Sequence, residues 1–399
     1  MSGLRVLIVG AGIGGCAAAL ALRREGCIVD VFEQAVIKVE VGAGIQISPN
    51  ASRLLYRYGL AKELDAIGVK PAAAVLRRWQ DGRELSREDF GVSAETAYGA
   101  PYYHVHRADL LAVLSGAIPA ERMHFGQRCV AIRDNGSVVR AEFEDGSFAE
   151  ADLLIGADGI HSFVRTHLFG HEHPRFSGSI AFRGLAPAGR IAHLGIEIVS
   201  SNWLGPGGHF VHYFVGGGRY LNFVAVSEQS GWERESWTDR ADASEAHARY
   251  EGWHPQIHAI LDSVDDIFKW ALFDREPLPC WSRGRVALLG DACHAMLPYM
   301  AQGAAQAIED GAALAVALRG TRQVEEALAL YERARKPRTT KVQMLARRNS
   351  VRFHLPDGPA QQERDAALAA MRSSQNPSGL SQDRMMLFGH DAEVLQLPA

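Results

Sequence analysis

Near its N-terminus the chain reads Leu4-Arg5-Val6-Leu7-Ile8-Val9-Gly10-Ala11-Gly12-Ile13-Gly14-Gly15. Residues 4–9 are an apolar, β-branched run, typical of a strand buried in a parallel sheet. Gly10, Gly12 and Gly15 then match the pattern G-x-G-x-x-G, and an Ala- and Leu-rich helix is expected over residues 16–24. In this pattern the first glycine permits a tight turn, the second admits a pyrophosphate, and the third lets the helix pack on the strand. The N-terminus of the helix then faces the anion.

A second strand is expected over Cys27–Glu33, and its last residue, Glu33, stands 18 positions after Gly15. An acidic side chain at this point can hydrogen-bond a ribose diol. A lone G-x-G-x-x-G is weak evidence, since a glycine turn can serve only to pack a helix on a strand. Here the strand, helix, second strand and acid follow in order, which predicts a dinucleotide site. This part of the chain leaves NAD and FAD both open.

Two later strands end in a similar turn. Residues 150–155 lead into Gly156-Ala157-Asp158-Gly159, and residues 285–289 lead to Gly290-Asp291. Parallel strands deliver such residues to one carboxyl edge of a sheet, where ligands bind. Asp291 is expected to hold a ribityl chain or ribose, and the helix after Gly303 offers free amides to a flavin ring. Asp158 either contacts the ligand or caps the helix that follows it.

At these residues the chain resembles the FAD-dependent aromatic hydroxylases, the single-component flavoprotein monooxygenases that include salicylate, 3-hydroxybenzoate and 6-hydroxynicotinate hydroxylases. The resemblance covers most of the chain. The motifs that carry it are Gly10–Gly15 with Glu33, Gly42–Gln46 with Pro49-Asn50, His106-Arg107 with Asp109-Leu110, Gly156–Gly159 with Arg165, Gly290-Asp291-Ala292, and Tyr331-Glu332 with Arg335 and Pro337-Arg338.

The resemblance implies FAD as the cofactor. The residues predicted to hold it are Gly10, Gly12, Ile13, Gly14, Gly15, Glu33, Gly44, Arg107, Asp158, Asp291, Gly303 and Ala304. Arg107 has an alternative role as one member of a solvated surface ion pair. No second G-x-G-x-x-G follows a strand, so NADH or NADPH is expected to dock transiently as the co-substrate. The sequence does not choose between the two.

Residues 176–273 have a different pattern, in which aromatic residues alternate with polar residues and glycine pairs. Such alternation predicts antiparallel strands. Along one of them His209 and Tyr213 share a face, while His212 lies on the other. His209 is the first candidate for a general base and His212 the second, although a lone strand histidine is more often structural. By the resemblance, Tyr213 and His209 correspond best to substrate-contacting positions.

Four further residues are candidates for the substrate side. Pro298 and Tyr299 follow the Asp291 strand and are expected beside the flavin ring, where several relatives have histidine or glutamine. Gln46 is expected on the pocket wall, where its amide can hydrogen-bond a hydroxyl or carboxylate group, or else it ties down its own loop. Arg183 either attracts a substrate carboxylate or holds two domains together.

The resemblance implies an enzyme that inserts one oxygen atom of O2 into a small hydroxylated aromatic acid of the salicylate or hydroxybenzoate type, through a flavin C4a-hydroperoxide. The predicted catalytic residues are His209, Tyr213, Pro298 and Tyr299, and the predicted substrate-binding residues are Gln46, Arg183 and His212. One alternative substrate is a larger natural-product aromatic ring, and another is a pyridine acid such as 6-hydroxynicotinate. A peroxide-forming oxidase and a non-enzymatic flavin sensor are alternative functions.

The expected fold class is α/β: a Rossmann-like FAD-binding domain, an interleaved, mostly antiparallel β-sheet substrate domain, and C-terminal helices. The FAD-binding domain is expected over 1–70, 101–175 and 268–345. The substrate domain is expected over 71–100 and 176–267, and the C-terminal helical segment over 346–399.

The charge and the apolar runs of the chain indicate which kinds of partner the protein is not expected to bind. The 42 Lys and Arg against 46 Asp and Glu give a net charge of −4, which does not favour nucleic acid. The basic cluster of Arg333, Arg335, Lys336, Arg338 and Lys341 is therefore predicted to be a solvated helix face. Apolar runs are too short for a membrane span, and nothing near Met1 is typical of a signal peptide.

The five cysteines lack CxxC spacing, so no disulfide framework and no metal site is predicted, and the cysteines are expected to be small core residues. These features favour a cytoplasmic protein. A monomer or a homodimer is expected.

Overall fold

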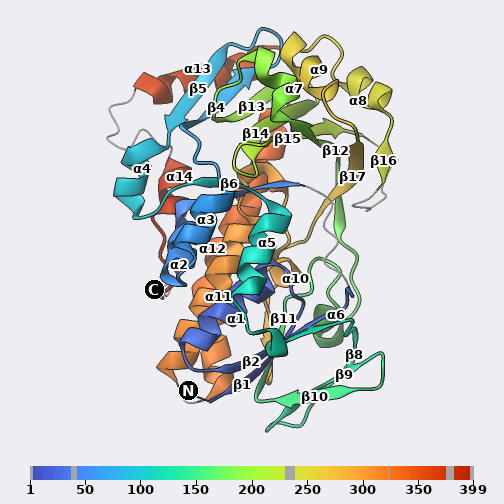
Figure 1. Ribbon diagram of the computed structural model, residues 1–399, viewed down its shortest axis with the longest axis vertical. Coiled ribbons are helices and arrows are strands. Elements are labelled where there is room, and N and C mark those ends of the chain that lie inside the picture. Colours follow the sequence, from blue (N-terminus) through green and yellow to red (C-terminus); the bar gives the residue numbers. More distant parts are fainter. Residues whose placement is uncertain (1–2, 37–42, 230–238, 322, 374–381, 396–399) are drawn as a thin grey trace.

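The computed structural model describes residues 3–36, 43–229, 239–321, 323–373 and 382–395 (Figure 1). Gly42, a residue of one motif above, lies outside the described residues. The α-helices are α1 (Ile13–Arg24), α2 (Pro49–Arg57), α3 (Ala61–Ile67), α4 (Gly91–Tyr98), α5 (Arg107–Gly116), α6 (Phe163–Phe169), α7 (Ala188–Ile191), α8 (Ala243–Arg249), α9 (Pro255–Leu261), α10 (Asp291–His294), α11 (Gly303–Gly320), α12 (Val324–Phe353), α13 (Pro359–Ser373) and α14 (Gln382–Phe388). The short 3-10 helices are η1 (Ala120–Arg122), η2 (Ala192–Leu194) and η3 (Pro298–Met300).

A mostly parallel sheet carries the glycine motif. Its strands, in spatial order, are β18 (Ser282–Arg283), β19 (Val286–Leu288), β11 (Leu153–Gly156), β1 (Arg5–Val9), β2 (Ile28–Glu33) and β7 (Met123–Phe125). Strand β1 is parallel to both β11 and β2, and β11 is parallel to β19. Because parallel neighbours end at the same edge, the turns that hold Gly10, Asp158 and Asp291 meet at one edge of this sheet.

Two small sheets flank this core. One consists of β8 (Cys129–Asp134), β9 (Val139–Phe143) and β10 (Phe148–Ala151), and the other pairs β3 (Gly44–Ile47) with β6 (Tyr103–His106). The antiparallel β3–β6 pair sets Gln46 directly opposite His104.

An eight-stranded sheet forms the upper part of the molecule in Figure 1. Its spatial order is β16 (Arg240–Ala241), β17 (Ile267–Asp274), β12 (Arg175–Pro187), β15 (Tyr220–Glu228), β14 (Gly208–Val215), β13 (Ser200–Gly205), β4 (Ala73–Arg78) and β5 (Glu84–Asp89). Only the β13–β4 pair is parallel among the described strands of this sheet. On one face, Phe210 and Phe223 pack against Tyr250 and Ile257, in the segment that contains α8 and α9. The predicted α/β fold class, with a Rossmann-like domain and a mostly antiparallel second sheet, is confirmed.

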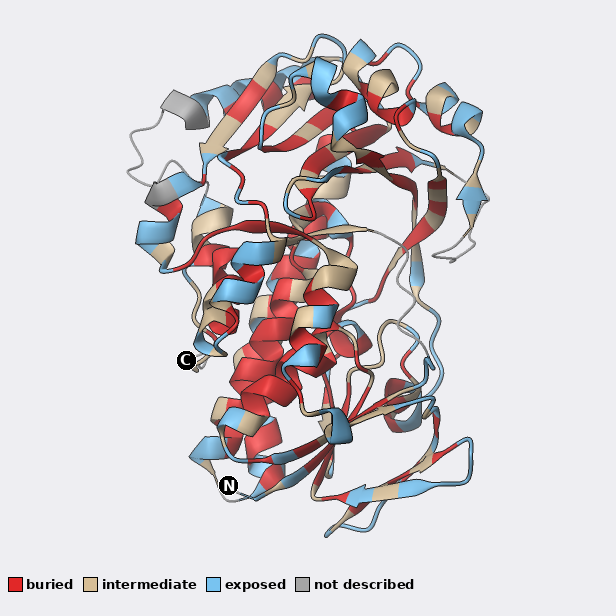
Figure 2. Cartoon of the chain, viewed as in Figure 1, coloured by how far each residue is buried: buried red, intermediate tan, exposed pale blue. Residues whose placement is uncertain are grey.

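Helices α1 and α11 pack closely because glycines stand at their contact. A Cβ atom on Gly14 would lie 3.0 Å from Cβ of Ala307, and one on Gly311 would lie 2.7 Å from Cα of Ala18. These two contacts advance together along both helices, so the helices run in the same direction and their N-termini lie together. Figure 2 shows both helices as largely buried in the middle of the molecule.

Helix α12 runs along the long axis of the molecule and links the two large sheets (Figure 1). Its side chains reach β18 through Glu332, which accepts a hydrogen bond from Ser282, and it ends beside β14, where His354 contacts His209. The helix continues without a break across residue 346, the last of the predicted domain boundaries. The division into domains stays a prediction.

The basic cluster on α12 is not a uniformly solvated face, contrary to the sequence prediction. Arg335 is 1% exposed, and its guanidinium group pairs with Glu309 at 2.5 Å and with Asp310 at 2.8 Å. Arg338 binds Glu309 as well, at 2.7 Å. Burial alone would raise the pKa of Glu309, but Arg338 and Arg335 lower it far below its usual value. Arg335 and Arg338 therefore hold α12 on α11, whereas Arg333 and Lys341 of the same cluster are exposed.

Asp310 of the same cluster also receives a hydrogen bond from the backbone amide of Gly290 and lies 2.6 Å from Nε2 of His294. Its contacts therefore tie the Asp291 turn to α11. His294 and Asp310 form a compact group with Cys293, whose thiol donates to the carbonyl of Gly290. Cys280 is exposed, which corrects the expectation that every cysteine is a core residue.

None of the helices within the described residues combines the length and the apolar character needed to cross a bilayer.

Candidate active site

The glycine loop meets two separate steric demands. Gly10 has φ +107°, and a Cβ atom there would lie 2.5 Å from the carbonyl oxygen of Ala157. A Cβ atom on Gly15 would lie 2.0 Å from the carbonyl oxygen of Gly10. Gly12 differs, because no described residue has an atom within 4 Å of such a Cβ atom. The protein itself requires Gly10 and Gly15, whereas Gly12 faces open space that a ligand can enter.

The first turns of α1 and α11 have backbone amides available for an anion. In the described part of the chain, neither helix has a side-chain hydrogen bond at its N-cap or an acidic residue in its first turn. The predicted cofactor residues Ile13, Gly14, Gly303 and Ala304 lie in these two turns, and the space around Gly303 is open in the same way as that around Gly12. Two adjacent helix N-termini with free amides favour a negatively charged ligand.

Glu33 ends β2 and Asp158 follows β11, the two strands on either side of β1, but their contacts differ. The carboxylate of Glu33 accepts a hydrogen bond from the amide of Ala11 at 2.8 Å, which fixes it against the glycine loop. Asp158 accepts from the hydroxyl of Ser162 at 2.5 Å and from the amide of Val164 at 3.1 Å. Asp158 thus makes the helix-capping contacts that were one of its two predicted roles.

Arg107, Asp291 and Gly44 complete the predicted cofactor set. The amide of Arg107 donates to the carbonyl of Ala43 at 2.9 Å, and the amide of Gly44 donates to the side chain of Asn222 at 2.7 Å. Burial raises the pKa of the Asp291 carboxyl group, and the positive charge of Arg107 opposes that shift. Asp291 is nevertheless exposed in this structure, so a bound ligand can contact it. Together these groups fit the ribose, pyrophosphate and ring of FAD.

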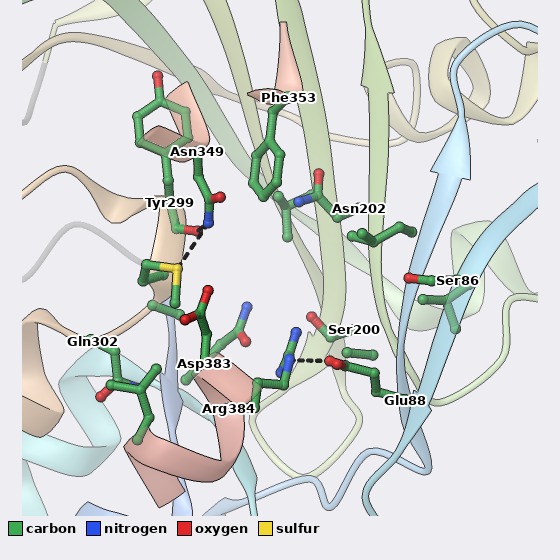
Figure 3. Close-up of a pocket in the computed structure, with 18 of the residues that line it drawn as sticks. Ser86, Glu88, Ser200, Asn202, Tyr299, Gln302, Asn349, Phe353, Asp383 and Arg384 are labelled. Atoms are coloured by element: carbon green, nitrogen blue, oxygen red, sulfur yellow. Dashed lines mark hydrogen bonds and ion pairs between the residues drawn. The ribbon is translucent and has the colours of Figure 1, made fainter. Parts of the chain in front are cut away.

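A cavity of ≈ 860 Å³ lies between the eight-stranded sheet, η3, α12 and α14 (Figure 3). Its volume is within the range of small-molecule sites. Figure 3 shows Tyr299, Phe353 and Asn202 toward one end, and Ser86 with the ion pair of Arg384 and Glu88 toward the other.

Four predicted residues line this cavity: Gln46, His209, Pro298 and Tyr299. They come from β3, β14 and η3, which are far apart in the sequence. The ring of His209 lies 5.0 Å from that of Tyr299, and burial, followed by the adjacent His354, lowers the pKa of His209 well below its usual value. His209 is therefore a neutral imidazole, with one ring nitrogen that carries no proton.

His212 does not lie in the cavity. Its Nε2 atom accepts a hydrogen bond from the indole of Trp203 at 3.1 Å, within the apolar layer on the opposite face of the sheet. The reason is the period of two along β14, which sends His209 and His212 to opposite faces. Burial lowers the pKa of His212 to about 3.

Tyr213 and Arg183 are buried but are not among the described lining residues of the cavity. Tyr213 packs on His104 with ring centroids 4.4 Å apart, and a Cβ atom on Gly44 would lie 2.7 Å from the Tyr213 ring. Tyr213 therefore borders β3, the strand that begins at Gly44. The guanidinium group of Arg183 lies over the ring of Trp270 at 4.8 Å.

The sequence analysis missed two residues beside Gln46. The hydroxyl of Tyr102 donates to Gln46 at 2.5 Å, and burial raises the pKa of Tyr102 to about 12. Both ring nitrogens of His104 lack a hydrogen-bond partner among the described residues, and burial lowers its pKa to about 3. The sequence did contain a signal for them, since Tyr102 and His104 are two positions apart, directly before the His106-Arg107 motif, and so share one face of a strand.

Gln302 was also missed, although it adjoins Gly303. It is buried at the N-cap of α11, where its amide nitrogen donates to the hydroxyl of Ser48 at 2.9 Å and its oxygen accepts from Asn50 at 3.3 Å. These contacts tie the loop after β3 to the start of α11. The motif at Pro49-Asn50 indicated a cofactor site, but it did not indicate that Gln302 would hydrogen-bond to this loop.

The far wall of the cavity was missed altogether. It comes from the end of α12 and from α14, and its side chains include Arg348, Asn349, Arg352, Phe353 and Asp383. This part of the sequence has no motif and no marked periodicity at these positions, so nothing in the sequence connects it to the cavity.

Comparisons with known proteins agree with this geometry. Residues 3–346 match the family described as FAD binding domain. The chain is 40% identical to 3-amino-4-hydroxybenzoate 2-monooxygenase of Streptomyces cremeus, over 98% of this chain and 96% of the relative. It is also 40% identical to 6-hydroxynicotinate 3-monooxygenase of Pseudomonas fluorescens, over 87% of this chain and 91% of the relative.

A solved structure, a salicylate hydroxylase substrate complex, is similar throughout its length. It superimposes with a TM-score of 0.81 at 28% identity, covering 100% of this chain and 99% of that one. The match over residues 3–346 spans every predicted FAD residue. The chain therefore belongs to the FAD-dependent aromatic hydroxylases, the family that its sequence motifs predict.

Proposed function

We propose that this protein hydroxylates a small aromatic acid that already carries a hydroxyl group, with FAD, NADH or NADPH, and O2. The observation that supports it most is the placement of His209, Gln46 and Tyr299 on one cavity beside the FAD residues. The bound flavin supplies the redox chemistry and delivers the oxygen atom. The protein then has to bind the acid, orient its ring and accept the proton of its hydroxyl group.

Arg352 is our proposed anchor for the substrate carboxylate. It lines the cavity, and no acidic side chain pairs with it among the described residues. Burial, together with repulsion from Arg348 and Arg364, lowers the pKa of its guanidinium group. A carboxylate would relieve this repulsion and accept two parallel hydrogen bonds. Arg183, on β12 of the eight-stranded sheet, is the second candidate for binding the substrate carboxylate.

His209 is our proposed general base. Loss of the hydroxyl proton makes the ring far richer in electrons, which favours attack on an electrophilic oxygen atom. Tyr299 packs against the imidazole and limits its rotation. Gln46 is held by Tyr102 and is placed to orient a hydroxyl or carboxylate group of the substrate. Pro298 is proposed to shape the turn next to the flavin ring, and Tyr213 is proposed to support β3, which holds Gly44.

A panel of acids tests the proposal. The holoenzyme is mixed in turn with 3-amino-4-hydroxybenzoate, 6-hydroxynicotinate, 3-hydroxybenzoate and salicylate, while NADH or NADPH oxidation and O2 uptake are followed. Products are identified by mass spectrometry, which also shows whether the carboxylate leaves. We expect at least one acid to give a hydroxylated product in proportion to the reductant consumed. Reductant oxidation without a hydroxylated product for every acid would contradict the proposal.

The volume of the cavity favours a second candidate substrate, a larger aromatic ring. A space of ≈ 860 Å³ exceeds the need of one benzoate molecule. Under this alternative the panel gives weak turnover, whereas bicyclic hydroxylated acids give full turnover. A cytoplasmic location and a monomeric or homodimeric state stay predictions from the sequence.

A further inference from the structure

A row of three side chains leads from the cavity to the surface of the eight-stranded sheet. His209 lines the cavity, and its Nδ1 atom lies 2.9 Å from Nε2 of His354. The Nδ1 atom of His354 lies 3.2 Å from the carboxylate of Glu228. Both histidines are buried, while the side chain of Glu228 is 59% exposed. The row therefore spans the wall between the cavity and solvent.

The backbone around the row fixes its spacing. Gly207, in the turn between β13 and β14, donates from its amide to the carbonyl of His354 at 3.0 Å. The carbonyl of the same glycine accepts from the amide of Glu228 at 2.8 Å. The carbonyl of His209 accepts from the hydroxyl of Tyr250 at 3.0 Å. Each member of the row is thus held in place by a main-chain contact that does not involve its side chain.

Aromatic rings surround the two imidazoles. The ring of Tyr299 lies 5.0 Å from that of His209 and 5.7 Å from that of His354, and Phe353 meets His209 edge-on at 5.5 Å. The two imidazole rings are stacked at an interplanar angle of 29°. Such packing keeps water away from the middle of the row and limits ring rotation.

The carboxylate at the outer end sets the direction of every hydrogen bond in the row. An ionised carboxylate only accepts, so Nδ1 of His354 carries a hydrogen and Nε2 of His354 is left as an acceptor. That acceptor requires a hydrogen on Nδ1 of His209, which leaves the lone pair on Nε2 of His209. The one nitrogen of His209 that does not face His354 is then ready to accept a proton.

We propose that His209, His354 and Glu228 form a relay that carries the hydroxyl proton of the substrate to solvent, an inference that rests on the proposed function. The O–H bond of the substrate breaks, its electron pair stays on oxygen, and the proton joins Nε2 of His209. The Nδ1 proton of His209 passes to Nε2 of His354, and the Nδ1 proton of His354 passes to Glu228 and then to water. The reverse passage, when the product oxygen regains a proton, restores the starting tautomers. His354 and Glu228 are positioning residues, since they act through His209.

Nitrogen NMR tests the connection without any substrate. The holoenzyme is labelled with 15N-histidine as wild type, Glu228→Gln and Glu251→Gln, and the signals are assigned with variants at 209 and 354. Glu251 is exposed on the same part of the molecule and provides the same change of charge away from the row. We expect Glu228→Gln to shift the ring signals of both His354 and His209, because an amide can donate as well as accept. Unchanged His209 signals in this variant would overturn the proposal.

Proton movement is tested with a coloured ligand, 4-hydroxy-3-nitrobenzoate, whose ionised form absorbs visible light. Rapid mixing with the holoenzyme below the pKa of the free ligand follows its ionisation in the cavity. We expect Glu228→Gln and His354→Leu to slow ionisation on the order of 10- to 100-fold, with Glu251→Gln at the wild-type rate. Equal rates in the three variants would contradict the relay, and Glu228→Gln decides the outcome if His354→Leu does not fold. Neither readout needs turnover, so failure of the acid panel alone would overturn the proposed function and not the relay.

Discussion

At the scale of single residues, the glycine loop separates what the fold needs from what the cofactor needs. Gly15 has no room for a Cβ atom because the carbonyl of Gly10 is 2.0 Å away, whereas Gly12 has open space. These demands explain why the loop could be predicted from the sequence, since each glycine leaves a fixed spacing in the chain. The side chains that line the cavity have no fixed spacing in the sequence, because they come from distant segments. Their chemistry depends on which residues the fold places beside them.

Replacing Gly12 with Ala should weaken FAD binding without unfolding the protein. The added methyl group meets no described atom of the protein, but it projects into the space where the backbone approaches a pyrophosphate. We expect the apoprotein to keep its melting temperature and to lose affinity for FAD by about 10-fold or more. Calorimetric titration of FAD and thermal melting measure the two effects. The matched variant Gly15→Ala should instead lower the melting temperature, and equal behaviour of the two variants would contradict this assignment.

Replacing Arg352 with Gln should raise KM for carboxylated substrates. The guanidinium group lines the cavity and has no acidic partner among the described side chains, so a carboxylate is its natural counter-charge. Loss of a charged hydrogen bond costs about 1.5–3 kcal/mol, which corresponds to a KM increase of about 10- to 100-fold. Steady-state kinetics on the best acid of the panel provide the measurement. Arg249→Gln, at an exposed position on α8, is the control, and an unchanged KM in Arg352→Gln would exclude the anchor role.

At the scale of elements, α11 and α12 are joined by buried charges and not only by apolar packing. Glu309 and Asp310 of α11 surround Arg335 of α12, and Arg338 adds a second cation. The sequence analysis assigned these arginines to solvent, because a basic run on one helix does not reveal the acids on another. The same limitation applies to His354, whose partners Glu228 and His209 lie more than a hundred residues away.

Replacing Arg335 with Gln should strongly destabilise the protein. The change leaves Glu309 and Asp310 buried with less opposing charge, and breaking such a pair costs about 3–5 kcal/mol. Urea unfolding of the holoenzyme, followed by fluorescence, gives the free energy of unfolding. Arg333→Gln is the matched control on the same helix, and its exposed position predicts a change within about 0.5 kcal/mol. Similar values for both variants would show that the buried network contributes little.

At the scale of the whole molecule, the sequence predicted the fold class and the FAD cofactor, but it predicted the substrate cavity only in outline. The edge of the parallel sheet was predictable because strand order and glycine turns impose it. The cavity was not, because its walls come from β3, β14, η3, α12 and α14, which meet only in the folded chain. His212 illustrates the difference: the alternation along β14 was clear, but the face toward the cavity was known only from the structure.

Buried neutral histidines should make the molecule sensitive to acid. Burial lowers the pKa of His104 and of His212 to about 3. As the pH falls below about 6.5, the unfolded chain binds protons at these positions that the folded chain does not bind. Each group then lowers the free energy of unfolding by up to about 1.4 kcal/mol per pH unit until the pH approaches 3.

Unfolding in urea at a series of pH values between 7 and 4 measures this slope. The variant His212→Gln keeps an acceptor for Trp203 but does not titrate, so its slope should be shallower by about one proton. The exposed His193→Gln serves as the control and should retain the wild-type slope. A slope in His212→Gln equal to that of the wild type would contradict this prediction.

The uninterrupted course of α12 past residue 346 has a practical consequence for engineering. A truncated chain that stops there would contain every predicted FAD residue but would lose Arg348, Arg352 and Phe353 from the cavity. We therefore expect that exchanging only the last fifty or so residues between two homologous hydroxylases changes the substrate preference of each enzyme. Such chimaeras should still bind the flavin.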